Sequence, residues 1–305
     1  MTGPDESLTG VAEGTESRPE RQTTPFLVLQ FFIFPMAIVA VCVTVFVVFG
    51  LIASEGRTAR DYLAEVRTGS ANRRWQAAFE LSKVLHANRE TALKDERFIP
   101  EIVSLYDESG TDDPRVRRYL AVALGRIGDR RAVPSLVKTI GMSDADPETL
   151  IYSVWALGAI GDAVASPALL ELASSEDRGI RKAVVHALGS LPSPEVRSAL
   201  RGALTDAADD VRWNAALALG RQGDGAAAPV LLQMMDRSHL ASVEGITPDQ
   251  RDEAVLQAVA GAASLRSPDL QAALERLRDA DPNLRVREAA RQALEGGTTK
   301  PSPRS

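Results

Sequence analysis

Residues 115–129 read RVRRYLAVALGRIGD, and residues 210–224 repeat this pattern as DVRWNAALALGRQGD. Two further copies lie between them, TLIYSVWALGAIGD at residues 149–162 and GIRKAVVHALGS at residues 179–190. The glycines of the four ALG triplets are Gly125, Gly158, Gly189 and Gly220. They are 33, 31 and 31 residues apart. Self-similarity at a nearly constant period predicts a repeat architecture.

Each copy carries the hydrophobic period of a helix. Counting back from Gly220, small or apolar residues stand nine, five and two positions earlier at Val211, Ala215 and Ala218, and polar Asn214 shares their face. These positions coincide on one side of a helix with 3.6 residues per turn. The small alanines allow neighbouring helices to approach closely, so we expect this face to pack against adjacent repeats.

Three copies continue into a common turn, G-D-x-x-x-x-P-x-L. It reads GDRRAVPSL at residues 128–136, GDAVASPAL at residues 161–169 and GDGAAAPVL at residues 223–231. Glycine can take the left-handed conformation that ends a helix, and aspartate can cap the helix that follows. Proline fits the first turn of a helix, where its missing N–H is not needed. The turn therefore predicts a second helix after each repeated one.

Divergent copies extend the array at both ends, with Ser82, Ala260 and Glu295 at the glycine position. The sequence thus predicts an all-α fold, an α-solenoid of about seven helix pairs. We expect the inner helices at residues 71–85, 113–127, 147–160, 177–191, 208–222, 248–263 and 282–295. We expect their outer partners at residues 58–67, 96–107, 131–141, 164–174, 194–205, 226–236 and 267–279. Residues 86–95 and 238–247 interrupt the period. Such insertions often form loops on a binding face, although simple tolerance of extra residues is the plainer interpretation.

A long apolar segment precedes the array. No charged residue occurs between Arg21 and Glu55, and residues 26–53 read FLVLQFFIFPMAIVAVCVTVFVVFGLIA. About 20 apolar residues suffice to cross a bilayer. A cleavable signal peptide would need a basic start and a much shorter apolar region. We therefore expect residues 26–53 to form one retained transmembrane helix.

Charge on either side of this segment predicts its orientation. Only Arg18 and Arg21 precede it closely, whereas Arg57, Arg60 and Arg67 follow it. The positive-inside rule then predicts that the array, residues 58–295, lies on the cytoplasmic side, as in a bacterial inner membrane. The polar ends of the chain, an acidic tail at residues 1–25 and a second tail at residues 296–305, are predicted to be disordered.

Composition argues against several function classes. The net charge is −6, and no strongly basic patch of the kind that binds a phosphate backbone occurs, so no nucleic-acid partner is expected. The one cysteine, Cys42, lies in the apolar segment, which leaves no zinc site of the usual Cys/His type. No Walker A loop and no G-x-S-x-G elbow is found. We predict no catalytic, metal or cofactor-binding residues and no cofactor.

The V-R-x-x-A-x-x-A-L-G helix and the G-D turn resemble the HEAT-like repeat of the phycobilin-lyase type, over roughly residues 58–295. The resemblance implies an α-solenoid; such repeats occur in scaffolds, in adaptors and in a few enzymes. HEAT-like deoxyhypusine hydroxylases are recognised by paired His-Glu dipeptides that bind iron. None of the three histidines here, His86, His186 and His239, is followed by glutamate, so that activity is not expected.

The resemblance also assigns a role to an arginine eight residues before the glycine position. Its members are Arg74, Arg117, Arg181, Arg212 and Arg287. In this repeat family such an arginine typically ties a helix to an aspartate of the inter-helix turn. The candidate acids here are Asp113, Asp177 and Asp209.

A binding surface is predicted on the repeated helices, which in HEAT-like folds line the concave side. The positions seven and three residues before the glycine position face away from the buried side. On five of these helices, nine of the residues at these positions form the set that we name the inner stripe: Trp75, Phe79, Arg118, Ile151, Trp155, Lys182, His186, Trp213 and Leu217. It includes all three tryptophans, and Trp and Arg are typical interface anchors. Alternatively, these rings pack between adjacent repeats.

These features predict a membrane-anchored scaffold or adaptor that binds a protein partner within a membrane-associated complex. A small-molecule ligand is not expected, and neither is enzyme activity. The alternative is a lyase-like enzyme, or an accessory subunit of one, of the phycobilin-lyase HEAT type. A long open groove would favour the scaffold, whereas a substrate-sized pocket with converging polar groups would favour the enzyme.

Overall fold

The computed structural model describes residues 33–53, 57–87, 89–191, 193–265 and 267–296, and the two predicted tails lie almost wholly outside this range. The chain divides into two compact units, Met1–Gly56 and Arg57–Ser305. In the first unit, α2 (Phe34–Ala53) is a helix of 20 residues without a charged side chain. Residues 26–32 of the predicted transmembrane segment lie outside the description. Among the described residues, no helix combines the length and the hydropathy that crossing a membrane requires.

In the described part of the second unit, helices are the regular secondary structure, and turns and loops connect them. There are sixteen α-helices, from α3 to α18. The inner helices are α4 (Ala71–Ala87), α7 (Pro114–Ile127), α9 (Pro147–Ile160), α11 (Arg178–Leu188), α13 (Asp209–Arg221), α16 (Pro248–Ala262) and α18 (Leu284–Gly296). The outer helices are α3 (Ala59–Thr68), α6 (Phe98–Glu108), α8 (Val133–Ile140), α10 (Ser166–Leu172), α12 (Pro194–Ala203), α14 (Ala228–Met235) and α17 (Pro268–Ala280). The seven predicted pairs are therefore confirmed.

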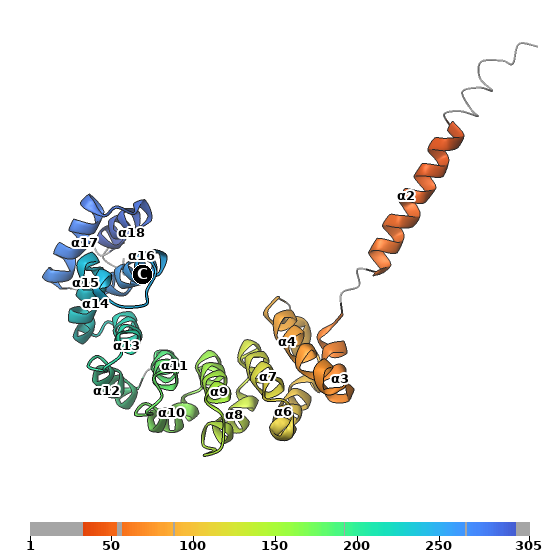
Figure 1. Ribbon diagram of the computed structural model, residues 1–305, viewed down its shortest axis with the longest axis horizontal. Coiled ribbons are helices and arrows are strands. Elements are labelled where there is room, and N and C mark those ends of the chain that lie inside the picture. Colours follow the sequence, from red (N-terminus) through yellow and green to blue (C-terminus); the bar gives the residue numbers. More distant parts are fainter. Residues whose placement is uncertain (1–32, 54–56, 88, 192, 266, 297–305) are drawn as a thin grey trace, which may run out of the picture. The chain divides into compact units, whose positions relative to one another are not determined.

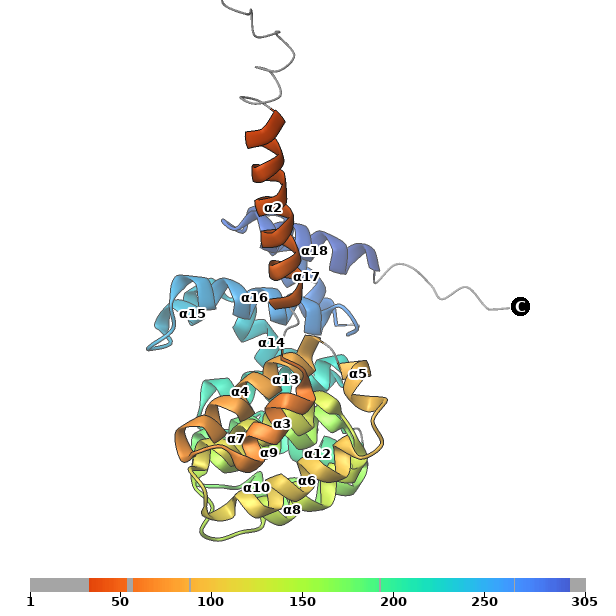
Figure 2. The ribbon, with the colours of Figure 1, turned by 90° about the vertical axis from the view of Figure 1, so that its right-hand side faces the viewer.

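The remaining two helices fall in the segments that interrupt the period. Helix α5 (Arg89–Leu93) follows the first pair, and α15 (Arg237–Ser242) lies between the two helices of the sixth pair. The pairs stack side by side, and each inner helix contacts the inner helix of the next pair. Figure 1 shows the inner helices from α4 to α13 on one side of the row and the outer helices α6, α8, α10 and α12 on the other. Figure 2, viewed along the row, shows the same two layers.

The Gly-Asp turns adopt the geometry that the sequence predicts. Gly128, Gly161 and Gly223 have positive φ values of 68°, 72° and 72°. The aspartate after each glycine accepts a hydrogen bond from the backbone N–H two residues later, which begins a short 3-10 helix. A proline then stands in the first turn of α8, α10 and α14. Each turn thus ends an inner helix and starts the next outer helix within a few residues.

The glycines of the ALG triplets mark where inner helices approach most closely. A Cβ added at Gly158 would lie 2.7 Å from both the Cα and the Cβ of Ala187 on α11. Gly125 and Gly189 face Ala156 and Ala218 in the same way, and each of these alanines stands two residues before the next glycine position. Glycine is therefore required by the short distance between the helices, and no left-handed backbone is involved.

The sixth pair departs from the register that the sequence alignment assigns. A Cβ at Gly220 would lie 2.7 Å from the backbone oxygen of Gly261. If Gly261 stands two residues before the glycine position, that position is Ala263, so the assignment to Ala260 is wrong by three residues. Burial does not distinguish the two registers, because Ala254, Val255, Ala258 and Val259 are all buried. A shift of nearly one helical turn preserves the apolar face, which explains why the pattern alone could not detect it.

Two of the five repeated arginines join successive pairs, and neither of them pairs with a predicted acid. Arg74 and Arg181 pair with Asp112 at 2.6 Å and Asp206 at 2.8 Å, each in the inter-helix turn of the next pair. Asp113 and Asp177, the predicted partners, instead accept backbone hydrogen bonds at the starts of α7 and α11. An aspartate that caps a helix directs its carboxylate at that helix's own N–H groups.

Within their own pair, the same arginines donate to backbone carbonyl groups. Arg181 bonds the carbonyl oxygens of Ser175 and Glu176, and Arg212 bonds those of Asp206 and Ala207. Of the three acids predicted, Asp209 does pair with its arginine, Arg212. One arginine can thus hold a turn in its own pair and, in two cases, a carboxylate of the next pair.

A candidate protein-binding face

The structure places the inner stripe on five consecutive inner helices, from α4 to α13, and none of its nine residues is buried. The exposed members are Phe79, Trp155, Lys182 and His186. The half-buried members are Trp75, Arg118, Ile151, Trp213 and Leu217. The stripe therefore forms part of the surface of the second unit.

The aromatic members also contact neighbouring repeats. The guanidinium carbon of Arg115, on α7, lies 4.2 Å from the ring centre of Trp75 on α4. Phe79 meets Tyr119 edge to face, with the ring centres 5.1 Å apart. Trp155 lies over Gly125, where an added Cβ would come within 2.7 Å of its ring. Packing between repeats and surface exposure thus coexist, and the use of this face by a partner stays a prediction.

Three members of the stripe line a cleft of about 600 Å³ near the sixth pair. These are Lys182 on α11, and Trp213 and Leu217 on α13. The opposite wall consists of the first half of α16 and the loop before it, including Glu244, Ile246 and Glu253. The loop belongs to the segment 238–247 that interrupts the repeat period, so the structure brings the insertion and the stripe together.

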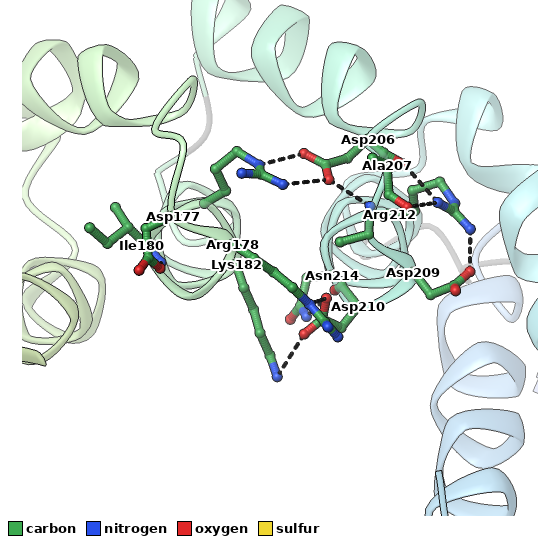
Figure 3. Close-up of polar contacts among 12 residues, drawn as sticks. Asp177, Arg178, Ile180, Lys182, Asp206, Ala207, Asp209, Asp210, Arg212 and Asn214 are labelled. Carbon is green, nitrogen blue, oxygen red and sulfur yellow. Dashed lines mark hydrogen bonds and ion pairs between the residues drawn. The ribbon is translucent and has the colours of Figure 1, made fainter. Parts of the chain in front are cut away.

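The α11 wall of the cleft carries excess positive charge (Figure 3). Arg178 pairs with Asp210 at 2.8 Å, and Lys182 approaches the same carboxylate at 3.3 Å. Asp210 lies in the first turn of α13, and its backbone carbonyl oxygen accepts a hydrogen bond from the side-chain amide of Asn214. Desolvation alone would raise the pKa of Asp210, but the hydrogen bond from Arg178 and the charges of Lys182 and Arg178 lower it below its ordinary value. Two cations thus share one carboxylate.

The α16 wall carries the opposite charge. Glu253 accepts one hydrogen bond, from the side-chain amide of Gln257 at 3.1 Å. Neither Glu253 nor Glu244 forms an ion pair with any residue in the described part of the chain. Both side chains are exposed. The cleft therefore has a basic wall and an acidic wall, separated by Trp213 and Leu217.

His186 is the one titratable ring of the stripe. Partial desolvation is the main cause that lowers the pKa of its imidazole, and the positive charges of Arg221 and Lys182 lower it further. The imidazole is therefore mostly neutral at pH 7 and contributes a polar ring to the surface without adding charge. Among the described residues, no group of three or more His, Cys, Asp or Glu side chains is placed to hold a metal ion.

The cleft residues outside the stripe were missed by the sequence analysis. Asp210, Glu244, Ile246 and Glu253 stand at no special repeat position. Their one signal was the interruption at residues 238–247, which indicated a loop without showing which inner helix it faces. A second cavity, about 710 Å³ between α14 and α17, was not predicted either.

The fold and this surface define the chain's second unit as an α-solenoid with a continuous side formed by its inner helices. A family model described as HEAT repeats matches residues 99–188, 139–211 and 167–247. These overlapping matches run from α6 to α15 and end just before α16, and this part of the chain belongs to the HEAT-repeat family. The predicted HEAT-like resemblance is thereby confirmed.

One solved structure supports the fold, and other solved structures align more weakly. The complex of CpcE and CpcF of phycocyanin lyase from Nostoc sp. PCC7120 is similar with a TM-score of 0.53 and 20% identity, over 79% of this chain and 97% of that chain. Human deoxyhypusine hydroxylase in complex with glycerol aligns at 18% identity with a TM-score of 0.33, over 78% of this chain and 95% of that chain. The archaeal HEAT-like repeats protein from Thermococcus onnurineus NA1 aligns at 16% identity with a TM-score of 0.43, over 80% of this chain and 98% of that chain. No curated protein matches the chain.

Proposed function

We propose that this protein is a membrane-anchored scaffold that holds a protein partner on the face formed by its inner helices. The observation that carries the proposal is the inner stripe, nine aromatic, apolar and cationic side chains on consecutive inner helices, none of them buried. Exposed Trp and Arg side chains dominate the binding energy of many protein interfaces. A HEAT-repeat array presents such side chains along an extended surface, which suits a protein segment.

The membrane anchor is part of the same proposal. Its support is the uncharged segment at residues 26–53, within which α2 is helical from Phe34 to Ala53. The arginines that follow the segment favour a cytoplasmic position for the solenoid, at a bacterial inner membrane. Two measurements test this part. The full-length chain should stay in the membrane pellet after carbonate extraction, whereas a variant without residues 1–56 should leave it. A green fluorescent protein fused after Ser305 should fluoresce, since it matures only in the cytoplasm.

The scaffold itself is tested by affinity purification of the tagged full-length protein from native membranes in mild detergent. The test variant carries Trp155→Ala and Trp213→Ala together. The matched control carries Val164→Ala, which removes an apolar side chain that is 73% exposed in the turn between α9 and α10. Urea unfolding first establishes that all three proteins are folded.

We expect one partner in stoichiometric amount with the wild type and the control, and its loss from the double variant. A partner retained equally by all three proteins would contradict the role of the stripe. A protein that purifies alone would contradict the scaffold and favour the alternative, a lyase-like enzyme or accessory subunit. That alternative rests on the fold shared with the phycocyanin lyase complex.

A further inference from the structure

The cleft beside the sixth pair is lined on one side by a loop whose two ends are fixed. Helix α15, which precedes the loop, is fixed by the fully buried Leu240 and by Arg237, which pairs with Asp281 at 2.8 Å. On the other side, Thr247 forms a capping box with Gln250 at the start of α16. Between these anchors, Gly245 turns the chain with a φ of 80°. Such a loop can present its side chains without a large loss of conformational entropy on binding.

The floor of the cleft is apolar and the walls are charged. Trp213 and Leu217 from α13 and Ile246 from the loop line the same cleft, and all three are half-buried, so part of each remains exposed. An incoming apolar side chain would remove this surface from water, worth about 25 cal/mol for each Å² covered. The excess positive charge on the α11 wall favours an acidic residue on one side of that apolar side chain. The unpaired negative charges of Glu244 and Glu253 favour a basic residue on its other side.

We propose that this cleft binds a short segment of the partner protein in which a large apolar side chain lies between an acidic and a basic residue. The apolar side chain contacts Trp213, Leu217 and Ile246. The acidic residue faces Lys182, and the basic residue faces Glu244 and Glu253. This inference rests on the proposed function, because it names the segment of the partner that the inner face receives.

The test uses full-length protein in lipid nanodiscs and a phage library of random ten-residue peptides. Enriched peptides are synthesised with a fluorescent label, and their Kd values are measured by anisotropy. The test variants are Glu253→Lys, which reverses one charge of the acidic wall, and Leu217→Ala, which removes most of one apolar side chain from the floor of the cleft. The control is Glu171→Lys, which makes the same charge reversal at an exposed position on α10, away from the cleft.

Enriched peptides should share a large apolar residue between Asp/Glu and Lys/Arg. Glu253→Lys should raise their Kd at least about tenfold, a change of about 1.4 kcal/mol, and exchange of the peptide's basic residue for glutamate should restore binding to that variant. Leu217→Ala should also weaken binding, whereas Glu171→Lys should change it less than about twofold.

Three results would overturn the inference: no enrichment over empty nanodiscs, enriched peptides without the charge pattern, or equal affinity for Glu253→Lys and the wild type. Its failure is distinguishable from failure of the scaffold. A native partner that co-purifies and is lost from the Trp155→Ala/Trp213→Ala variant, but is retained by Glu253→Lys, would leave the scaffold standing and exclude this cleft.

Discussion

The pairs from α6 to α13 follow one another at a period of 31 to 33 residues, whereas the sixth pair, α14 with α16, contains α15 and a loop between its helices. In the regular pairs, a glycine meets an alanine of the next inner helix, and Arg181 reaches a carboxylate of the following turn. In the sixth pair two glycines, Gly220 and Gly261, meet across the same interface.

The comparison indicates that the regular pairs mainly stabilise the solenoid, whereas the sixth pair mainly forms the proposed binding cleft. Close contacts between regular pairs leave little room for extra residues. The glycine of each inner helix lies directly against an alanine of the next inner helix. The sixth pair accommodates an insertion between its own two helices, and the loop then lines a cleft with the preceding pairs. Substitutions in the regular pairs should therefore change the free energy of unfolding, whereas substitutions at the cleft should change binding.

The largest expected effect tests the close approach of the regular pairs. Gly158→Val places a branched side chain where even a Cβ would lie 2.7 Å from the Cα of Ala187. We expect the free energy of unfolding to fall by about 3 kcal/mol, because the two helices must separate. Urea denaturation followed by circular dichroism measures it. Gly202→Ala is the control: nothing lies within 4 Å of its Cβ position on α12, so stability should rise by about 0.5 kcal/mol. Equal stability of the two variants would contradict the packing role of Gly158.

The next effect concerns the arginine that joins the fourth and fifth pairs. Arg181→Ala removes the ion pair to Asp206 and leaves the carbonyl oxygens of Ser175 and Glu176 without this donor. We expect a clear loss of stability at pH 7, since hydrogen bonds to charged groups are among the stronger ones. Arg201→Ala, whose guanidinium is far more exposed, should cost less than half as much in the same urea titration. A larger loss for Arg201→Ala would refute this ranking.

The same ion pair predicts an acid dependence. The hydrogen bond from Arg181 holds the pKa of Asp206 below its ordinary value of 3.8. The folded state therefore binds this proton less readily than the unfolded state. The stabilisation is fully present above pH 3.8 and is lost as the pH falls through the lowered pKa of the folded protein. The stability gap between the wild type and Arg181→Ala should narrow between pH 5 and pH 2. A gap that stayed constant over this range would show that Asp206 is not the partner that matters.

A smaller effect is expected at the Gly-Asp turns. Gly161 has a φ of 72° and no atom near its Cβ position, so substitution changes the backbone preference alone. Gly161→Ala should lower the free energy of unfolding by about 1 kcal/mol, and Gly161→Asn by less, because Asn adopts this conformation more easily. Thermal unfolding of the two variants side by side would reveal the order. If Asn were the costlier substitution, the explanation by backbone conformation would fail.

Much of the fold could be predicted because its determinants are local. The Gly-Asp turns and the period of the inner helices placed all seven pairs within a few residues of their observed bounds. The partners of the arginines could not be predicted in the same way, because Asp112 and Asp113 are adjacent and only backbone geometry decides which one caps α7. The cleft could not be predicted, because it depends on the path of the inserted loop. The repeat period is interrupted there, so it does not indicate which inner helix the chain faces after Leu240.

The central claim, that the inner face and not the rest of the solenoid binds a protein partner, is tested most directly by site-specific photocrosslinking in native membranes. The photoreactive residue p-benzoylphenylalanine replaces either Trp155, on α9, or Val164, in the turn that follows α9. Val164 is 73% exposed and Trp155 only 36%, so exposure alone would favour crosslinks at position 164. The account predicts a discrete crosslinked species at position 155 and none at position 164. Crosslinks at position 164 alone, or equally at both positions, would contradict it.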